Sequence, residues 1–259
     1  MSSRVSRSAP LTAYVLHRYD WSESSLILDL FTREQGRIAV AAKGAKRPFS
    51  QLRSVLLPFQ RIHVSLGRQA SGEDTRDVHN LRGAEWTGGG AMLTGAALFN
   101  GFYLNELLLK LIARHDPHAD LFDAYAATVA ALGAGDAGAQ AALRAFEIVL
   151  LREIGLLPDL GIETATRQPL VAGERYRVLA DAGVVAAPGA TDGTASGRTL
   201  AAIQAALGSG DLAALQQAIS PSLAELRPIL RAQLHYHLGT DTLRTRQVML
   251  DAQALMPTR

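Results

Sequence analysis

The sequence predicts a multidomain protein of α and β structure, in which a five-stranded barrel is followed by an all-helical domain. Two observations lead to this prediction. Apolar residues alternate with a period of two up to about residue 82, and they recur at helical spacing from about residue 93. A glycine-rich segment, residues 86–91, separates the two patterns. We therefore expect one domain at residues 1–84 and a second at residues 85–259, which suits a chain of 259 residues.

Five short segments carry the strand pattern, and turn-forming residues separate them. In the clearest segment, Ile62, Val64 and Leu66 alternate with polar side chains. Five short strands within about 80 residues are typical of a small closed barrel. The predicted strands are Leu11–His17, Leu26–Phe31, Gly36–Lys43, Arg61–Leu66 and, less clearly, Thr75–Leu81.

The basic residues are concentrated in the predicted barrel. The whole chain has 26 Lys and Arg against 24 Asp and Glu, but residues 1–70 hold 11 basic and only 4 acidic side chains. No acid occurs between Gln35 and Gly72. A segregated cationic surface indicates a polyanionic partner, most often nucleic acid, so we expect a barrel of the oligonucleotide-binding (OB) type. The alternative is a solvated basic face without a partner.

Helical periodicity dominates the second predicted domain. It predicts three helices between residues 93 and 155, and Gly155 is a typical stop signal for the third. Three more helices are expected at residues 198–207, 211–219 and 222–238, with the alternative that the last one begins at Pro228 because proline breaks helices. At the start of the last one, Ser222 and Glu225 have the spacing of a capping box. Residues 159–197 are predicted to be an irregular insert, in which Arg175–Leu179 has the composition of a strand.

The catalytic and metal-binding patterns that we tested are absent or out of context, so we expect a binding protein and not an enzyme. The chain has no cysteine, which excludes disulfides, thiol nucleophiles and cysteine-rich zinc sites. Gly133–Gly138 matches a dinucleotide-binding pattern, but it follows a predicted helix instead of a strand, so we interpret it as a linker. The two close histidine pairs, His115 with His118 and His235 with His237, lack the spacing of a metal-binding helix. We therefore expect no cofactor, no metal and no small-molecule substrate.

Short motifs spread along the chain form an ordered set. They are Val15–Leu26, Leu30–Arg37, Ala42–Arg47, Leu56–Phe59, Tyr103–Leu108, Leu143–Glu147, Ile154–Leu160, Leu238-Gly239 and Leu243–Arg246. In this order they resemble the signature of the bacterial RecO family over essentially the whole chain. Each motif is modest alone, but the ordered set is specific.

This resemblance implies an OB fold, a helical domain and a recombination mediator without a catalytic site. Such proteins bind single- and double-stranded DNA and anneal complementary strands that are coated by single-stranded-DNA-binding protein (SSB). With the partner RecR they help to load the RecA recombinase, which implies a cytoplasmic, nucleoid-associated protein. Many members carry a four-cysteine zinc module, but the corresponding residues here, Gly161–Arg167, include no cysteine. We therefore expect no structural zinc.

We predict that the basic residues of the barrel bind the sugar-phosphate backbone. The densest group is Lys43, Lys46 and Arg47, in a loop that leaves a predicted strand. Phe49, or Trp21 and Tyr19, are candidates to stack on bases. The alternative role for these rings is packing at the end of the barrel. The predicted DNA-binding residues are Arg18, Arg37, Lys43, Lys46, Arg47, Arg53 and Arg61.

The resemblance also implies that the helical domain binds the acidic C-terminal tail of SSB. Arg144 is the candidate for the carboxylates, because an Arg fork grips a carboxylate at two points. The alternative is an ion pair of Arg144 with Glu147, one helical turn away. The apolar wall of this predicted site is formed by Leu104, Leu108, Phe146 and Leu150.

Two other functional classes remain open at the level of the sequence. A metal-dependent nuclease would use Asp20, Glu23 or Asp29, but these acids are scattered through a predicted turn and strand. A helical adaptor would use the basic barrel to bind a protein or an acidic membrane surface. No apolar run of about 18 residues is free of charges and breakers, so we expect a soluble, intracellular protein without a membrane span.

Overall fold

The computed structural model describes residues 9–69, 78–88, 92–135, 138–240 and 242–254, with the side chains of residues 68, 69 and 252–254 excepted. The chain divides into two compact units, Met1–Gly133 and Ala134–Arg259. Each unit has a core of its own, so the two are described separately.

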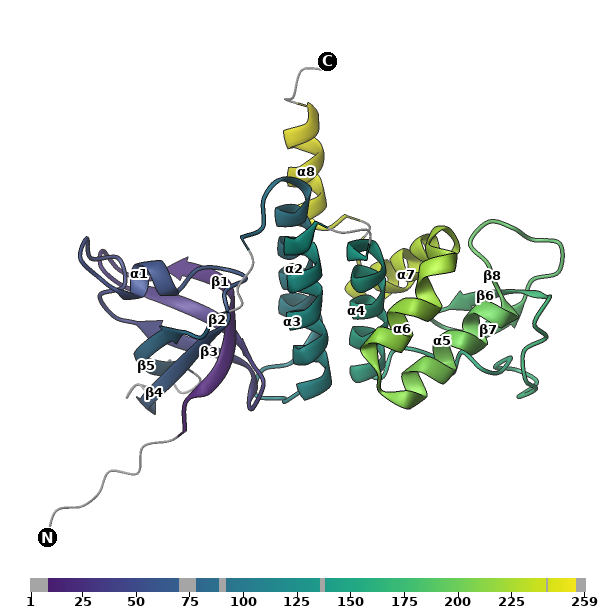
Figure 1. Ribbon diagram of the computed structural model, residues 1–259, viewed down its shortest axis with the longest axis horizontal. Helices are drawn as coiled ribbons and strands as arrows, with labels where there is room; N and C mark the ends of the chain where they lie inside the picture. Colours follow the sequence, from purple (N-terminus) through teal and green to yellow (C-terminus); the bar gives the residue numbers. More distant parts are fainter. Residues whose placement is uncertain (1–8, 70–77, 89–91, 136–137, 241, 255–259) are drawn as a thin grey trace, which may run out of the picture. The chain divides into compact units, whose positions relative to one another are not determined.

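The first unit begins with a closed five-stranded barrel, in the strand order β1-β2-β3-β5-β4 (Figure 1). Neighbouring strands are antiparallel, except that β3 and β5 are parallel. This topology is that of an OB fold, and it confirms the predicted barrel. The elements are β1 (Leu11–Asp20), β2 (Leu26–Thr32), β3 (Gly36–Ala42), a short helix α1 (Leu52–Val55), β4 (Ile62–Gln69) and β5 (Val78–Trp86). The fifth strand extends beyond the predicted Thr75–Leu81, whose first three residues lie outside the described part of the chain.

Strand β1 is buried on both faces over Ala13–Leu16. Ala13 and Val15 belong to the core inside the barrel, together with Leu28, Leu30 and other apolar side chains of the strands. Tyr14 points to the opposite side, because successive side chains of a strand alternate between its faces. This double burial explains why β1 reads as a nearly continuous apolar run.

Two helices, α2 (Gly95–Leu111) and α3 (Ala119–Ala134), pack against the outside of the barrel (Figure 1). The ring of Tyr14 lies 5.4 Å from that of Phe122 and 5.0 Å from that of Tyr125, measured between ring centroids. Asn105 donates a hydrogen bond of 2.9 Å to the carbonyl of Leu16 and accepts one of 2.7 Å from the Tyr125 hydroxyl. These buried contacts join both helices to the barrel. The compact unit therefore extends well beyond residue 84, the boundary that we expected for the first domain, whereas the barrel itself ends at Trp86.

The second unit is mainly helical. Its helices are α4 (Ala139–Glu153), α5 (Gly197–Ser209), α6 (Leu212–Ile219), the 3-10 turn η2 (Ser220–Ser222), α7 (Leu223–Leu238) and α8 (Arg244–Ala254). Helix α7 continues through Pro228. The predicted capping box at its start is wrong: the Ser222 hydroxyl lies 3.0 Å from that of Thr199, and Glu225 pairs with Arg175 at 2.6 Å. The two side chains hold α7 to other elements instead of capping it.

The predicted irregular insert contains a small antiparallel sheet in the order β7-β6-β8. Its strands are β6 (Arg175–Leu179), β7 (Gly183–Ala186) and β8 (Ala195–Ser196), so the one strand expected here, β6, is confirmed. Tyr176 and Val178 are buried, and Gln233 of α7 donates a hydrogen bond of 2.8 Å to the Val178 carbonyl. Packing and hydrogen bonds therefore hold this segment against the helices.

Candidate nucleic-acid interface

A β-bulge near the middle of β1 decides where its last residues point. The register against β2 shifts between Val15 and His17. Before the shift, Val15 lies opposite Leu30 inside the barrel. After it, Arg18 lies opposite Leu28 and Asp20 opposite Leu26. Because a bulge adds one residue and switches the faces of those that follow, Arg18 and Asp20 turn toward the end of the barrel interior.

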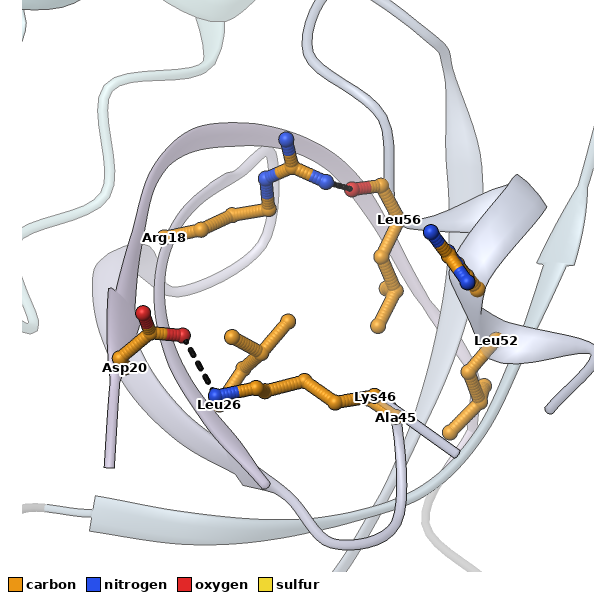
Figure 2. Close-up of a pocket in the computed structure, with 8 residues that line it drawn as sticks. Arg18, Asp20, Leu26, Ala45, Lys46, Leu52 and Leu56 are labelled. Atoms are coloured by element: carbon orange, nitrogen blue, oxygen red, sulfur yellow. Dashed lines mark hydrogen bonds and ion pairs between the residues drawn. The ribbon is translucent and has the colours of Figure 1, made fainter. Parts of the chain in front are cut away.

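These two side chains line a pocket of about 400 Å³ at the end of the barrel (Figure 2). Its other charged residues are Lys46, in the loop after β3, and Arg53 of α1. Its apolar surface comes from Leu26, Ala45, Leu52 and Leu56. Figure 2 shows Arg18 on one side, Asp20 with Lys46 on another, and Leu52 and Leu56 on a third. The pocket thus combines an apolar floor with a predominantly cationic rim.

Among the described residues, the rim carries three cations and one carboxylate. Lys46 Nζ lies 3.0 Å from the Asp20 carboxylate and donates a hydrogen bond of 3.1 Å to the Ser22 carbonyl. Arg18 donates a hydrogen bond of 3.5 Å to the Leu56 carbonyl, and no acid among the described residues forms an ion pair with it. Arg53 makes no ion pair with any residue that the structure describes. The site therefore has an excess of positive charge, as an anionic ligand requires.

The loop between β3 and α1 extends this cationic surface. Lys43 and Arg47 are exposed, and neither forms an ion pair within the described part of the chain. Phe49 is 99% exposed, which is exceptional for a large apolar side chain. An exposed aromatic ring beside uncompensated cations is the combination that binds stacked bases and the phosphates between them.

Two of the predicted DNA-binding residues do not belong to this surface. Arg37 is only 15% exposed, lies 3.8 Å from the buried Asp29 carboxylate, and donates hydrogen bonds to the carbonyls of Leu108 and Leu109 at the end of α2. It therefore joins the barrel to α2. Arg61 is exposed, but it precedes Ile62, which pairs with Ala13 near the start of β1. Most of the length of β1 separates it from the pocket.

The three candidates for base stacking, Tyr19, Trp21 and Phe49, differ in their exposure and orientation. Tyr19 points away from Arg18, because it is the next residue of the same strand, and its hydroxyl contacts Asp29 at 3.5 Å. Partial burial and the neighbouring Asp29 carboxylate raise the pKa of this phenol. Trp21 is 50% exposed in the loop between β1 and β2. Phe49 and Trp21 are thus the exposed rings in the two loops that flank the pocket.

Sequence reasoning did not find the apolar floor of the pocket or the part of Asp20 in its rim. Leu52 and Leu56 have the (i, i+4) spacing of one helix face, which was a usable signal for an apolar surface over the barrel end. The contribution of Asp20 depends on the bulge in β1. No local pattern announces that bulge.

The residues of the predicted SSB-tail site lie in two different units. Leu104 and Leu108 are fully buried in the first unit, and Phe146 and Leu150 are fully buried in the second. Arg144 is 13% exposed and pairs with the buried Glu147 at 2.7 Å, as the alternative interpretation expected. The four apolar side chains are therefore core residues, and Arg144 is the one member of the set with an accessible surface.

Residues Gly161–Arg167, which correspond in the sequence to the zinc module that the resemblance implies, do not have the ligands for a zinc ion. A structural zinc site needs four thiolate or imidazole ligands in a tetrahedral arrangement. In this segment Thr164 accepts a hydrogen bond of 2.8 Å from the Val184 amide, and Glu163 binds the Thr166 hydroxyl at 2.7 Å. Within the described ranges, no three His, Asp or Glu side chains gather as metal ligands would.

The helices of the same ranges include none with the length and apolar character to cross a bilayer.

Comparison with known proteins agrees with this geometry. The family described as "Recombination protein O N terminal" matches residues 8–87, and "Recombination protein O C terminal" matches residues 92–247. The DNA repair protein RecO of Polaromonas sp. strain JS666 is 51% identical over 245 residues, which cover 94% of this chain and 96% of that protein. The DNA repair protein RecO of Polaromonas naphthalenivorans is 51% identical over 256 residues, which cover 98% and 99%. That of Verminephrobacter eiseniae is 51% identical over 254 residues, or 96% and 98%.

The barrel topology and the cationic pocket at its end define an OB-fold protein with an attached helical region. The two family matches together cover nearly the whole chain, and the relatives match it over almost their full length. The chain belongs to the RecO family of DNA repair proteins, as its motifs indicated.

Proposed function

We propose that this protein is a non-catalytic recombination mediator that binds single- and double-stranded DNA through the end of its barrel. The observation that carries the proposal is the convergence of Arg18, Lys46 and Arg53 on one pocket, next to the exposed Lys43 and Arg47. We name this set of five residues the barrel-end cations. Backbone contacts of this kind do not read sequence, which suits a repair factor that must act anywhere on DNA.

The same surface supports annealing of complementary strands. Two DNA strands repel each other, and a cationic protein surface lowers that barrier while it concentrates both strands locally. No nucleotide hydrolysis is needed, because the duplex product is more stable than the separate strands.

Protein partners complete the proposal. SSB coats the single strands, its acidic tail is the expected ligand of the second unit through Arg144, and RecR is the expected partner in loading RecA. Arg144 lies in α4, where its guanidinium pairs with the buried Glu147 at 2.7 Å and 13% of its side chain stays exposed. We expect the protein to act on DNA in the bacterial cytoplasm.

The test is annealing of complementary oligonucleotides that are each covered by SSB. We expect the protein to accelerate duplex formation without ATP, and we expect the rate to fall as salt concentration rises. The control is a variant in which the barrel-end cations are replaced by alanine. Annealing at the uncatalysed rate with the unaltered protein, or cleavage of either strand in the presence of magnesium, would contradict the proposal.

A further inference from the structure

The pocket at the end of the barrel has a shape and chemistry that a simple phosphate track does not require. A track for the DNA backbone needs only exposed cations. This pocket also has a volume of about 400 Å³ and an apolar floor of leucine side chains. Pockets of roughly 300–1,000 Å³ are those that take small ligands.

We propose that the pocket takes one unstacked nucleotide of a single strand, with its base on the leucine floor and its phosphate at the cationic rim. This inference rests on the proposed DNA binding and adds to it a site that distinguishes single strands from duplex. A nucleotide is the ligand class that combines a flat apolar face with an anionic group, as the pocket combines its floor and rim.

The floor is suited to a base because it is apolar and open. Leu56 is buried at the top of the barrel core, whereas Leu26 and Leu52 are partly exposed and pack against that core. Figure 2 shows Leu26 between Arg18 and the Asp20–Lys46 pair. Aliphatic side chains exclude water from a base without the geometric demands of an aromatic ring. The partly exposed leucines would thereby lose their remaining contact with water.

The rim is suited to the phosphate of that nucleotide. Arg18 and Arg53 carry charges that no described carboxylate compensates, so they are free to bind a phosphate. The Asp20 carboxylate keeps an accessible side chain, 79% exposed, while it holds Lys46. An exposed ion pair is exchanged readily, so Lys46 can release this carboxylate and bind a phosphate.

The loops beside the pocket carry exposed rings that would stack on the bases next to the bound nucleotide. Trp21 directly follows Asp20, and Phe49 comes three residues before Leu52, so each exposed ring belongs to a segment that also supplies the pocket. Stacking on such rings holds the adjacent bases of a single strand. In a duplex each base is held by its partner and by its neighbours, and its removal breaks both the pairing and the stacking. The pocket should therefore favour single strands.

The experiment compares a pocket-filling variant with a control that adds the same bulk nearby. Leu52→Trp fills the pocket without changing any charge. Leu57→Trp places an indole on a side chain that is 38% exposed and does not line the pocket. Binding is measured on a single-stranded oligonucleotide and on a duplex of the same length. We expect Leu52→Trp to weaken single-strand binding about tenfold, while duplex binding and the salt slope stay unchanged. Leu57→Trp should bind both as the unaltered protein does.

A second measurement uses the unaltered protein and does not depend on the folding of a variant. The fluorescent base 2-aminopurine is quenched by stacking, so its insertion onto an aliphatic floor should raise its emission in a single strand but not in a duplex. Thermal unfolding verifies that Leu52→Trp is folded, and Leu26→Phe replaces it if it is not. No rise in emission, or an equal loss of single-strand and duplex binding in a folded variant, overturns the pocket but leaves the proposed function intact. Failure of the unaltered protein to bind any DNA would contradict both the nucleotide pocket and the proposed function.

The same pocket chemistry also suits a free nucleotide, and a competition arm separates the two sources. Deoxyadenosine 5′-monophosphate should displace the oligonucleotide only at concentrations far above those at which the strand itself binds. Displacement at concentrations equal to those of the strand would overturn the assignment to DNA.

Discussion

Lys46 Nζ lies 3.0 Å from the Asp20 carboxylate, so an acid that lines the barrel-end pocket restrains one of the cations beside it. A DNA phosphate competes with that carboxylate for Lys46. We therefore predict that Asp20→Asn strengthens single-strand binding about two- to fivefold, because an exposed ion pair of this kind is worth little and is readily exchanged. Fluorescence anisotropy at low salt measures the gain. The matched control, Asp123→Asn, removes an equal charge from the Arg33 ion pair on α3 and should leave affinity unaltered. Weaker binding by Asp20→Asn would show that the carboxylate itself contacts the ligand.

Salt dependence tests the barrel-end cations as a group. Each phosphate contact on a single strand contributes a slope of about −0.7, so five contacts predict a log–log slope of about −3.5. Replacement of Lys43, Lys46 and Arg47 by alanine should reduce it to about −1.4 and weaken binding. The control removes the same charge from the second unit, at Arg177, Arg227 and Arg231, which are exposed. An unchanged slope in the first variant, or an equal change in both, would place the DNA elsewhere.

Arg37 should behave as a structural residue and not as a DNA contact. Its guanidinium faces the buried Asp29 and the end of α2, so Arg37→Ala leaves a buried acid with fewer partners. We predict a loss of about 2–3 kcal/mol in the free energy of unfolding, measured in urea, with an unchanged salt slope of DNA binding. Arg53→Ala should show the reverse, weaker DNA binding with unchanged stability. A stable Arg37→Ala protein whose DNA binding has a reduced salt slope would show that Arg37 contacts DNA.

Arg144 tests the proposed tail-binding site. Arg144→Ala should weaken binding of an acidic peptide that ends in an aromatic residue by about tenfold or more, because a charged hydrogen-bonded pair is lost. It also removes the ion pair of the buried Glu147, so the measurement belongs well below the unfolding temperature. DNA binding by the variant should stay close to normal, and the exposed Arg198 provides a control substitution in the same unit. Equal losses of affinity for the peptide and for DNA would show that the acidic tail does not bind at α4.

Tyr125 predicts how the first unit responds to alkali. Burial raises the pKa of this phenol well above its usual value, because the phenolate is disfavoured away from water. The unfolded chain loses the proton at about pH 10, while the folded chain keeps it, so stability is retained below that pH and falls as the pH rises beyond it. Urea unfolding at pH 9 and 11 measures the loss.

Tyr125→Phe serves as the comparison for that measurement. The variant should show a smaller loss between pH 9 and 11, because its unfolded chain has one phenol fewer to ionise. At neutral pH it should be less stable by about 1–3 kcal/mol, since Asn105 loses the hydrogen bond from the Tyr125 hydroxyl. An identical pH response in both proteins would assign the effect to another group, such as Tyr14, whose pKa burial also raises.

The fold was accessible from the sequence because its strongest signals are local. Alternation in Ile62, Val64 and Leu66 follows from a strand with one face in the barrel core, and it needs no knowledge of the strand's neighbours. The helical spacing from residue 93 onward arises in the same way. The sheet around β6 was largely missed, because β7 and β8 are short and gain their order from pairing with β6, which a hydrogen bond from Gln233 joins to α7.

Three features could be inferred from the order of the residues alone: the succession of strands and helices, the family, and the concentration of positive charge near residues 37–61. Which of those charges share a surface depends on the folded arrangement of the chain. A single bulge in β1 turned Arg18 and Asp20 into the barrel end, and one buried acid, Asp29, drew Arg37 to the helices. Both outcomes depend on partners distant in the chain, because burial and register are properties of a strand's surroundings and not of its own residues.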